Sequence, residues 1–210
     1  KILLIQNKAL ELSLFLSLPA TLALLIGSEE IISALFGYGS FDQKSVNNSS
    51  LALYYFALGL PAFALIKVFS SFFFANHDTK TPFLISLISV ILNILISIYY
   101  FKQIGFIIIP IATSISSWFN SILLFLFLKN KELFYFNEKF FVKFIKIIIA
   151  SILMGLFFNF LLNFFQNELS LDKTIKSFYL ILCVILGLLF YLIVCYLIKA
   201  FKMSDIKLKY

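Results

Sequence analysis

The chain of 210 residues is 62% hydrophobic and 13% charged, with a mean hydropathy of +1.03. A soluble domain of this length cannot bury so much apolar surface, so the composition excludes an ordinary soluble protein and indicates one embedded in lipid. Six helical spans of roughly 20 residues would use about 120 residues and leave the rest for loops and ends. The apolar runs are long and continuous, which favours helices over the short alternating strands of a membrane barrel.

Six apolar runs follow one another along the chain, and each predicts one membrane-spanning helix. Between the first two runs, residues 29–36 predict a short interfacial helix capped by Ser28, because two glutamates occupy its first turn. The sequence Asn47-Asn48-Ser49-Ser50 predicts a break, and Thr81 predicts a cap for a helix that begins at Pro82. The six predicted spans are residues 10–26, 51–73, 82–100, 106–128, 144–165 and 178–198.

The lysines predict the orientation of these spans. All 17 basic residues are lysines: 12 fall on the side that holds both termini, 4 fall on the other side, and Lys67 lies inside the second span. The positive-inside rule therefore places both termini in the cytoplasm. The net charge of +7 is explained by this bias, so we expect no nucleic-acid partner.

Polar residues recur at steps of three and four along the third and fourth spans, which places them on one face of each helix. Two such faces could line a cavity, coordinate a cation, or join helices through hydrogen bonds worth about 1 kcal/mol or less each. The first face carries Ser86, Ser89, Asn93 and Ser97, and the second carries Thr113, Ser116, Ser117, Asn120 and Ser121.

The last two spans carry small residues at four-residue steps, which are typical of close helix packing. We interpret the two faces as an antiparallel pair. The fifth span has Ser151, Gly155, Asn159 and Asn163, and the sixth has Cys183, Gly187, Tyr191 and Cys195.

Lys67 lies inside the second predicted span, six residues before its end. It can extend its four-carbon stem to the membrane surface, or it can point into a cavity and contact an anionic substrate. The sequence contains no Ser/His/Asp arrangement, metalloprotease motif, phosphate-binding loop or catalytic carboxylate pair. We therefore expect no enzymatic activity.

Several motifs in this order and spacing resemble the MviN/MurJ family of lipid II flippases, over about residues 10–128. The last two spans are similar in position and hydropathy more than in motif. The motifs are Leu18-Pro19-Ala20, Leu35-Phe36-Gly37-Tyr38-Gly39, Gly59-Leu60-Pro61-Ala62-Phe63, Lys67-Val68, Phe72-Phe73-Phe74-Ala75, Asp78-Thr79-Lys80-Thr81-Pro82, Asn93, Gly105, Ala112-Thr113-Ser114 and Ser117-Trp118 with Asn120.

The resemblance implies an all-α integral membrane protein in which six helices form the C-terminal part of a fourteen-helix transporter with two lobes. Residues 1–130 would be the last four helices of the C-lobe. Residues 131–210 would be a cytoplasmic loop, two groove-forming helices and a cytoplasmic tail. The partners would be membrane lipids and the missing N-terminal helices of the same protein.

The activity implied by the family is peptidoglycan biosynthesis at the bacterial inner membrane, where lipid II moves from the cytoplasmic to the periplasmic leaflet by alternating access. The alternatives are a flippase for another lipid-linked oligosaccharide, such as an O-antigen precursor, and a structural or assembly protein that does not transport.

The resemblance also assigns residues. Lys67 matches a family lysine and would contact the anionic substrate. A sodium site in the family matches Asn93, Ser97, the carbonyl of Ile109, and Thr113. Family members can have an acidic residue where this chain has Ser97, and the loss of a carboxylate weakens attraction for a cation.

Overall fold

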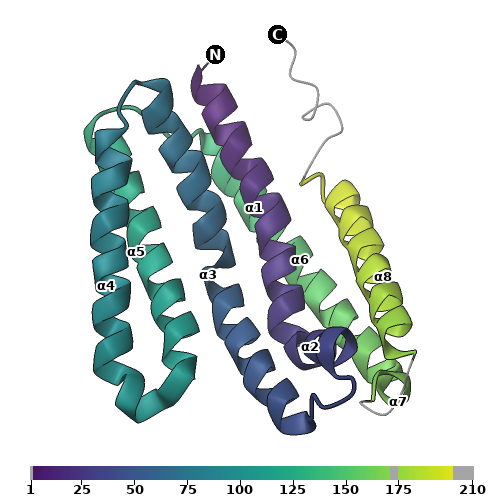
Figure 1. Ribbon diagram of the computed structural model, residues 1–210. Helices are drawn as coiled ribbons and strands as arrows, with labels where there is room; N and C mark the ends of the chain where they lie inside the picture. The colour runs from purple at the N-terminus through teal and green to yellow at the C-terminus, as the bar shows by residue number, and fades with distance from the viewer. Residues whose placement is uncertain (1, 171–174, 201–210) are drawn as a thin grey trace. The chain divides into compact units, whose positions relative to one another are not determined.

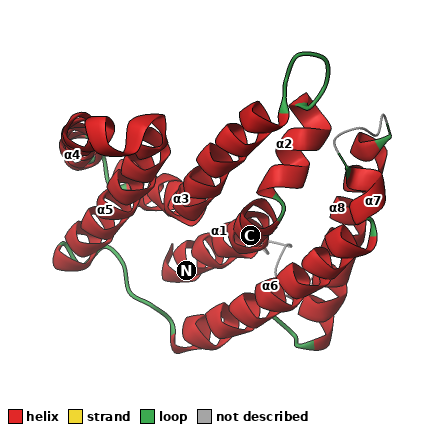
Figure 2. Cartoon of the chain, turned by 90° about the horizontal axis from the view of Figure 1, so that it is seen from below, coloured by secondary structure: helices red, strands yellow, loops and turns green. Residues whose placement is uncertain are grey.

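The computed structural model describes residues 2–170 and 175–200, and the regular structure within them is helical (Figures 1 and 2). The helices follow the apolar runs of the sequence and are separated by short turns. They are α1 (Ile2–Ile26), α2 (Ser28–Phe36), α3 (Gln43–Ala75), α4 (Lys80–Ile104), the 3₁₀ turn η1 (Gly105–Ile107), α5 (Ile108–Asn130), α6 (Glu138–Phe164), α7 (Gln166–Leu169) and α8 (Lys176–Leu197).

Five helical segments of the described chain are long and apolar enough to cross a membrane: Ile5–Ile26, Gln43–Ala75, Lys80–Asn130, Lys139–Phe164 and Lys176–Leu197. The third has 51 residues and contains both α4 and α5. A straight helix of that length would be about 75 Å long, far more than the roughly 30 Å of a hydrocarbon core. The turn at η1 divides it, which supports two crossings, and the total of six stays a prediction.

The turn between α4 and α5 depends on Gly105. Its backbone has φ 73° and ψ −152°, a conformation that is essentially restricted to glycine. Its N–H donates to the carbonyl of Phe101 and ends α4. α5 then runs back along α4, and the two helices form a hairpin (Figures 1 and 2).

The start of α3 corrects the predicted break at residues 47–50, which are helical. The helix begins at Gln43, because Asp42 accepts a hydrogen bond from the backbone N–H of Ser45 at 2.9 Å and so caps the first turn. The first two turns of α3 are mostly polar. A prediction from the apolar run alone therefore makes the helix too short.

Two predicted helix caps are wrong. Ser28 is the first residue of α2, whose N-cap position is Gly27 and has no side-chain cap, because the chain passes from α1 into α2 almost without interruption. α4 begins at Lys80 instead of Pro82. The cap is the carboxylate of Asp78, which accepts from the backbone N–H of Thr81 at 3.0 Å and from its hydroxyl at 2.7 Å.

The ends of α3, α5 and α8 share one backbone motif. At the end of α3, the N–H of Asp78 donates to the carbonyl of Phe73 and that of His77 to Phe74, the pattern of a Schellman motif. His77 has φ 58°, and Glu132 and Lys199 occupy the same position after α5 and α8 with φ 56° and 53°. Glycine is usual at this position. The backbones of these three residues therefore adopt a left-handed conformation that is unfavourable for residues with a side chain.

The described chain forms two compact units. The first contains residues 2–17 and 55–142. In this unit α3 packs closely on α5: a Cβ at Gly59 would lie 2.8 Å from the hydroxyl oxygen of Ser114. The Ser114 hydroxyl donates to the carbonyl of Tyr55, and the indole of Trp118 donates to that of Leu58 at 2.9 Å.

Phenylalanine rings fill one end of the first unit. Phe134 is buried and stacks on Phe72 at 5.8 Å, and it meets Phe136 edge-on at 4.9 Å. The series continues to Phe140. These rings join α3, the segment after α5 and the first turn of α6. The side chains of Gln6 and Asn7 donate to carbonyls of the same segment, so α1 is fastened to it too.

The second unit contains residues 18–54, 143–170 and 175–200. The predicted small-residue faces both pack here, with different partners. Gly187 of α8 faces Phe158 and Met154 of α6, as expected for the pair, whereas Gly155 of α6 faces Leu22 and Ile26 of α1. These two compact units differ from the predicted division at residue 130. The assignment of residues 1–130 to the C-lobe and of residues 131–210 to the loop, groove helices and tail stays a prediction.

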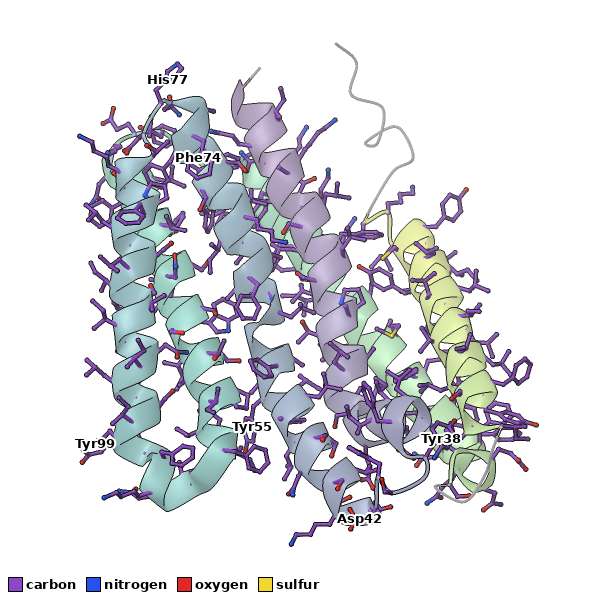
Figure 3. All side chains as sticks on the ribbon, in the orientation of Figure 1. Tyr38, Asp42, Tyr55, Phe74, His77 and Tyr99 are labelled. Atoms are coloured by element: carbon purple, nitrogen blue, oxygen red, sulfur yellow. The ribbon has the colours of Figure 1, made fainter. Side chains whose placement is uncertain are left out.

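Large apolar side chains are exposed along the outer faces of several helices. On α4, Ile98 is 71% exposed and Tyr99 70%; on α8, Tyr196 is 77% exposed (Tyr99 is labelled in Figure 3). A soluble protein rarely exposes so much contiguous apolar surface. Contact with lipid chains explains these faces.

Candidate functional site

The hairpin of α4 and α5 carries the two predicted polar faces, and the structure brings them together. Asn93 of α4 donates from Nδ2 to the hydroxyl oxygens of Thr113 at 3.1 Å and Ser116 at 3.3 Å. Asn120, one turn beyond Ser116 on α5, donates at 3.4 Å to the hydroxyl oxygen of Ser86, which lies two turns from Asn93 on α4. The α-helical spacing that aligns residues four apart therefore produces two adjacent contacts across the hairpin.

A cleft of about 280 Å³ opens at this polar contact, and we call it the hairpin cleft. Its walls come from α3, α4 and α5, all within the first unit. None of its lining residues is charged. They are Phe63, Ile66, Ser86, Ser89, Val90, Asn93, Thr113, Ser116, Ser117 and Asn120.

Most hydroxyls in the hairpin cleft donate to a backbone carbonyl of their own helix. Ser89 donates to Ile85, Thr113 donates to Ile109 at 2.8 Å, and Ser117 donates to Thr113. These bonds satisfy the hydroxyl hydrogens and leave oxygen lone pairs. The cleft thus offers acceptor oxygens to a cation or a polar ligand.

Two buried oxygens near the cleft have no hydrogen-bond partner among the described residues: Oδ1 of Asn120 and Oγ of Ser97. An unsatisfied buried oxygen costs about 1–3 kcal/mol. Such a cost indicates that a hydrogen-bond partner is missing, and a ligand or a water molecule could donate to these oxygens.

The structure brings together three of the four predicted cation ligands. Asn93 contacts Thr113, and Thr113 contacts the Ile109 carbonyl. Ser97 lies one turn beyond Asn93 on α4, outside the cleft lining, with its buried unpartnered oxygen. The donor set is four neutral oxygens, which suits sodium by atom type and lacks the charge that would hold it strongly.

Lys67 is exposed on α3 and does not line the hairpin cleft, although its neighbour Ile66 does. Its carbonyl accepts from Ser71, and its ammonium has no ion-pair partner in the part of the chain that the structure describes. Its role as an anion contact stays a prediction.

The cleft also contains residues that were not among the four predicted cation ligands. Ser116, Ser117 and Asn120 belong to the polar face of the fourth span, so the three- and four-residue spacing was a usable signal. Phe63 and Ile66 carry no polar signal, and only the packing of α3 on the hairpin places them there.

The helices and the cleft define a polytopic α-helical membrane protein with a polar site inside its apolar spans. A sequence model described as lipid II flippase MurJ matches residues 1–180. The chain belongs to this family, which confirms the resemblance of its motifs.

Individual relatives agree with this assignment. A probable lipid II flippase MurJ of Rickettsia prowazekii is 41% identical over 116 residues, which cover 55% of this chain and 23% of the relative. One from Rhizobium tropici is 32% identical over 205 residues, 97% of this chain and 38% of the relative. The chain therefore spans less than two fifths of these relatives.

A solved structure is also similar to the chain. It is described as lipid II flippase MurJ in an inward closed conformation, and it superposes with a TM-score of 0.77 at 27% identity. The match covers 94% of this chain and 39% of the solved chain. The helical arrangement is thus that of a MurJ segment.

Proposed function

We propose that the protein containing this chain is a flippase that carries lipid II across the bacterial inner membrane by alternating access. The observation that carries the proposal is the family match over residues 1–180. The chain covers only part of its relatives, so the activity would require the remaining helices. The six predicted spans would be the last six of fourteen.

The hairpin cleft would face the transport pathway. A polar group inside a span costs free energy unless it faces protein or water, and this cleft gathers polar residues from two helices. The unpartnered oxygens of Asn120, in the cleft lining, and of Ser97, one turn beyond Asn93, leave acceptors for water or a polar ligand as the lobes move. The lipid-facing sides of α4 and α8 would meet membrane lipids.

Lys67 would contact the pyrophosphate of the substrate from α3. Its ammonium is exposed and has no ion-pair partner among the described residues, so it is available to an anion. An ammonium acts as a point charge, and this property is enough for phosphate recognition.

A sodium ion would be held by Asn93, Ser97, the Ile109 carbonyl and Thr113. When bound, it would supply a positive charge on the polar face of the hairpin. The residues themselves contribute oxygen atoms on two adjacent helices and keep the hairpin contact closed.

The orientation proposed for the whole protein places both ends of this segment in the cytoplasm. The lysine bias of 12 to 4 supports it. The loop at His77, which lies at one end of α3 and α4, would then be cytoplasmic (Figure 3). Single cysteines at His77 and Asp42 should be labelled from opposite sides of the membrane.

The decisive experiment is complementation. A bacterium depleted of its own lipid II flippase receives the full-length protein, and growth and accumulation of lipid II are measured. Rescue supports the proposal. Failure, with the protein inserted and abundant, would contradict it and favour a different lipid-linked oligosaccharide or a structural role.

Lys67 is tested in the same assay. Lys67→Ala should reduce rescue and Lys67→Arg should retain much of it, because the charge remains. Lys44→Ala is a matched control, since this exposed lysine lies in the polar first turn of the same helix. Equal rescue by Lys67→Ala and the wild type would indicate that Lys67 only reaches the membrane surface.

A further inference from the structure

A second cavity, in the other compact unit, has a different chemical character from the hairpin cleft. It has a volume of about 330 Å³ and lies between α2, the first turn of α3, the end of α6 and α7. We call it the acidic pocket. Its lining residues are Glu29, Glu30, Ser33, Gln43, Leu162, Gln166, Leu169 and Ser170.

Two carboxylates form one wall of the acidic pocket. Glu29 and Glu30 are consecutive in the first turn of α2, and Ser33 follows on the same side of this helix, one turn later. Neither carboxylate has a lysine within ion-pair distance among the described residues. Two adjacent negative charges are thus left without a neutralising partner.

Glu29 is exposed and Glu30 is half-buried, so the open side of the acidic pocket can be reached from solvent. Glu30 is partly withdrawn from water, and the negative charge of Glu29 stands next to it in the same helical turn. A cation bound between them would remove the repulsion and compensate for the lost hydration.

Ser33 supplies an independent observation. The residue is 93% buried and lines the acidic pocket, and its hydroxyl oxygen has no hydrogen-bond partner among the described residues. A serine in a helix commonly donates to the carbonyl four residues back, which here would be Glu29. The hydroxyl does not make this bond, so its oxygen is left for a ligand.

Further oxygen donors surround the same space. The amide nitrogen of Gln43 donates to Glu29 at 2.9 Å and to Asn47 at 2.8 Å, which leaves its carbonyl oxygen as an acceptor. The Ser170 hydroxyl donates to the Asn167 carbonyl, so its lone pairs remain. Gln166 adds a second amide to the lining.

We propose that the acidic pocket is a binding site for a divalent cation of the calcium or magnesium type. Hard cations of this kind take six or more oxygen ligands, including carboxylates, amide carbonyls and waters. The pocket offers two carboxylates with neutral oxygens, and its volume leaves room for waters to complete the coordination. The site would fasten α2 to the α6–α7 corner.

Calcium binding to the purified full-length protein in detergent tests this site by equilibrium dialysis with radioactive calcium. The wild type should bind calcium saturably, and magnesium should compete. Glu29→Gln and Glu30→Gln should each weaken binding about tenfold or more, because they remove ligand charge. Ser33→Ala should weaken it about threefold without changing the charge.

Glu132→Gln is the matched control, since it removes the same charge from an exposed residue after α5 and should bind calcium like the wild type. Thermal unfolding provides a second measurement: calcium should raise the Tm of the wild type but not of Glu30→Gln. The proposal is overturned if the wild type shows no saturable binding, or if Glu30→Gln binds as tightly as the wild type.

Discussion

Lys131 and Asp78 join two loops that are 53 residues apart in the chain. The ammonium of Lys131, after α5, donates to Oδ2 of Asp78 at 2.5 Å and to the Thr81 hydroxyl at 3.2 Å. It also lies 5.8 Å from the ring of Phe73. Asp78 therefore caps α4 and binds the end of α5 at the same time, which gives the Asp-Thr-Lys-Thr-Pro motif a structural role.

We expect Asp78→Asn to lower the Tm at neutral pH. Hydrogen bonds from Lys131 and Thr81 hold the pKa of Asp78 well below its usual range. A carboxylate with a lowered pKa contributes stability above its unfolded pKa of about 3.9, and this stability is lost as the pH falls through the folded value. The difference in Tm between wild type and variant should therefore shrink below about pH 4.

Thermal unfolding between pH 3 and pH 8 measures this effect. Glu132→Gln removes a nearby charge that has no ion-pair partner among the described residues, and it should leave the Tm almost unchanged. A constant difference between Asp78→Asn and the wild type across the whole pH range would contradict the assignment.

We expect His77→Gly to stabilise the protein by about 0.5–1 kcal/mol. His77 has φ 58° in the Schellman motif of α3, where an L-residue is disfavoured and glycine is not. Glu132→Gly should act in the same direction after α5. Asn76→Gly, one residue earlier and without a positive φ, should not stabilise, and chemical denaturation of the three variants compares them.

Alanine at Gly59 and at Gly187 should have opposite effects. A Cβ at Gly59 would lie 2.8 Å from the Ser114 hydroxyl oxygen and 3.1 Å from the Ser114 Cα, so α3 and α5 must separate, at a cost of about 1–3 kcal/mol. At Gly187 the nearest atom would be 3.5 Å away, and the better helix propensity of alanine should stabilise by up to about 1 kcal/mol. Equal Tm values for the two variants would contradict this difference.

Ser97→Asp should strengthen sodium binding to the full-length protein, and Ser97→Ala should weaken it. A carboxylate adds attraction for a cation beside the neutral oxygens of Asn93 and Thr113, whereas alanine removes the unpartnered hydroxyl. Binding of radioactive sodium by the two variants measures the change. Identical binding by both would remove Ser97 from the proposed site.

The sequence allowed the helices and the polar hairpin to be predicted because both are local patterns. Twenty apolar residues identify a span, and a polar residue at every third or fourth position predicts one polar face on each helix. The structure then shows that the two faces meet, with Asn93 in contact with Thr113. Helix ends were harder to predict. The cap of α3 at Asp42 lies in polar sequence outside the span, and His77 gives no glycine signal for its left-handed turn.

The acidic pocket could not be predicted for another reason. Glu30 and Gln166 are more than 130 residues apart, and no spacing rule relates them. Only the packing of α2 on the α6–α7 corner brings them to one cavity. The same holds for Lys176, which is fully buried at the start of α8, donates to the Gly37 carbonyl and lies 4.3 Å from the Tyr38 ring (Tyr38 is labelled in Figure 3).

The three-residue turn at Gly105 has a consequence for biosynthesis. It makes α4 and α5 one continuous stretch of chain, and the polar contacts of the hairpin cleft that cross between helices, such as Asn93 to Thr113, fall within residues 80–130. A helical hairpin can enter the bilayer as a pair with its polar side chains already facing each other. The cleft can therefore assemble during translation, before α6 and α8 leave the ribosome.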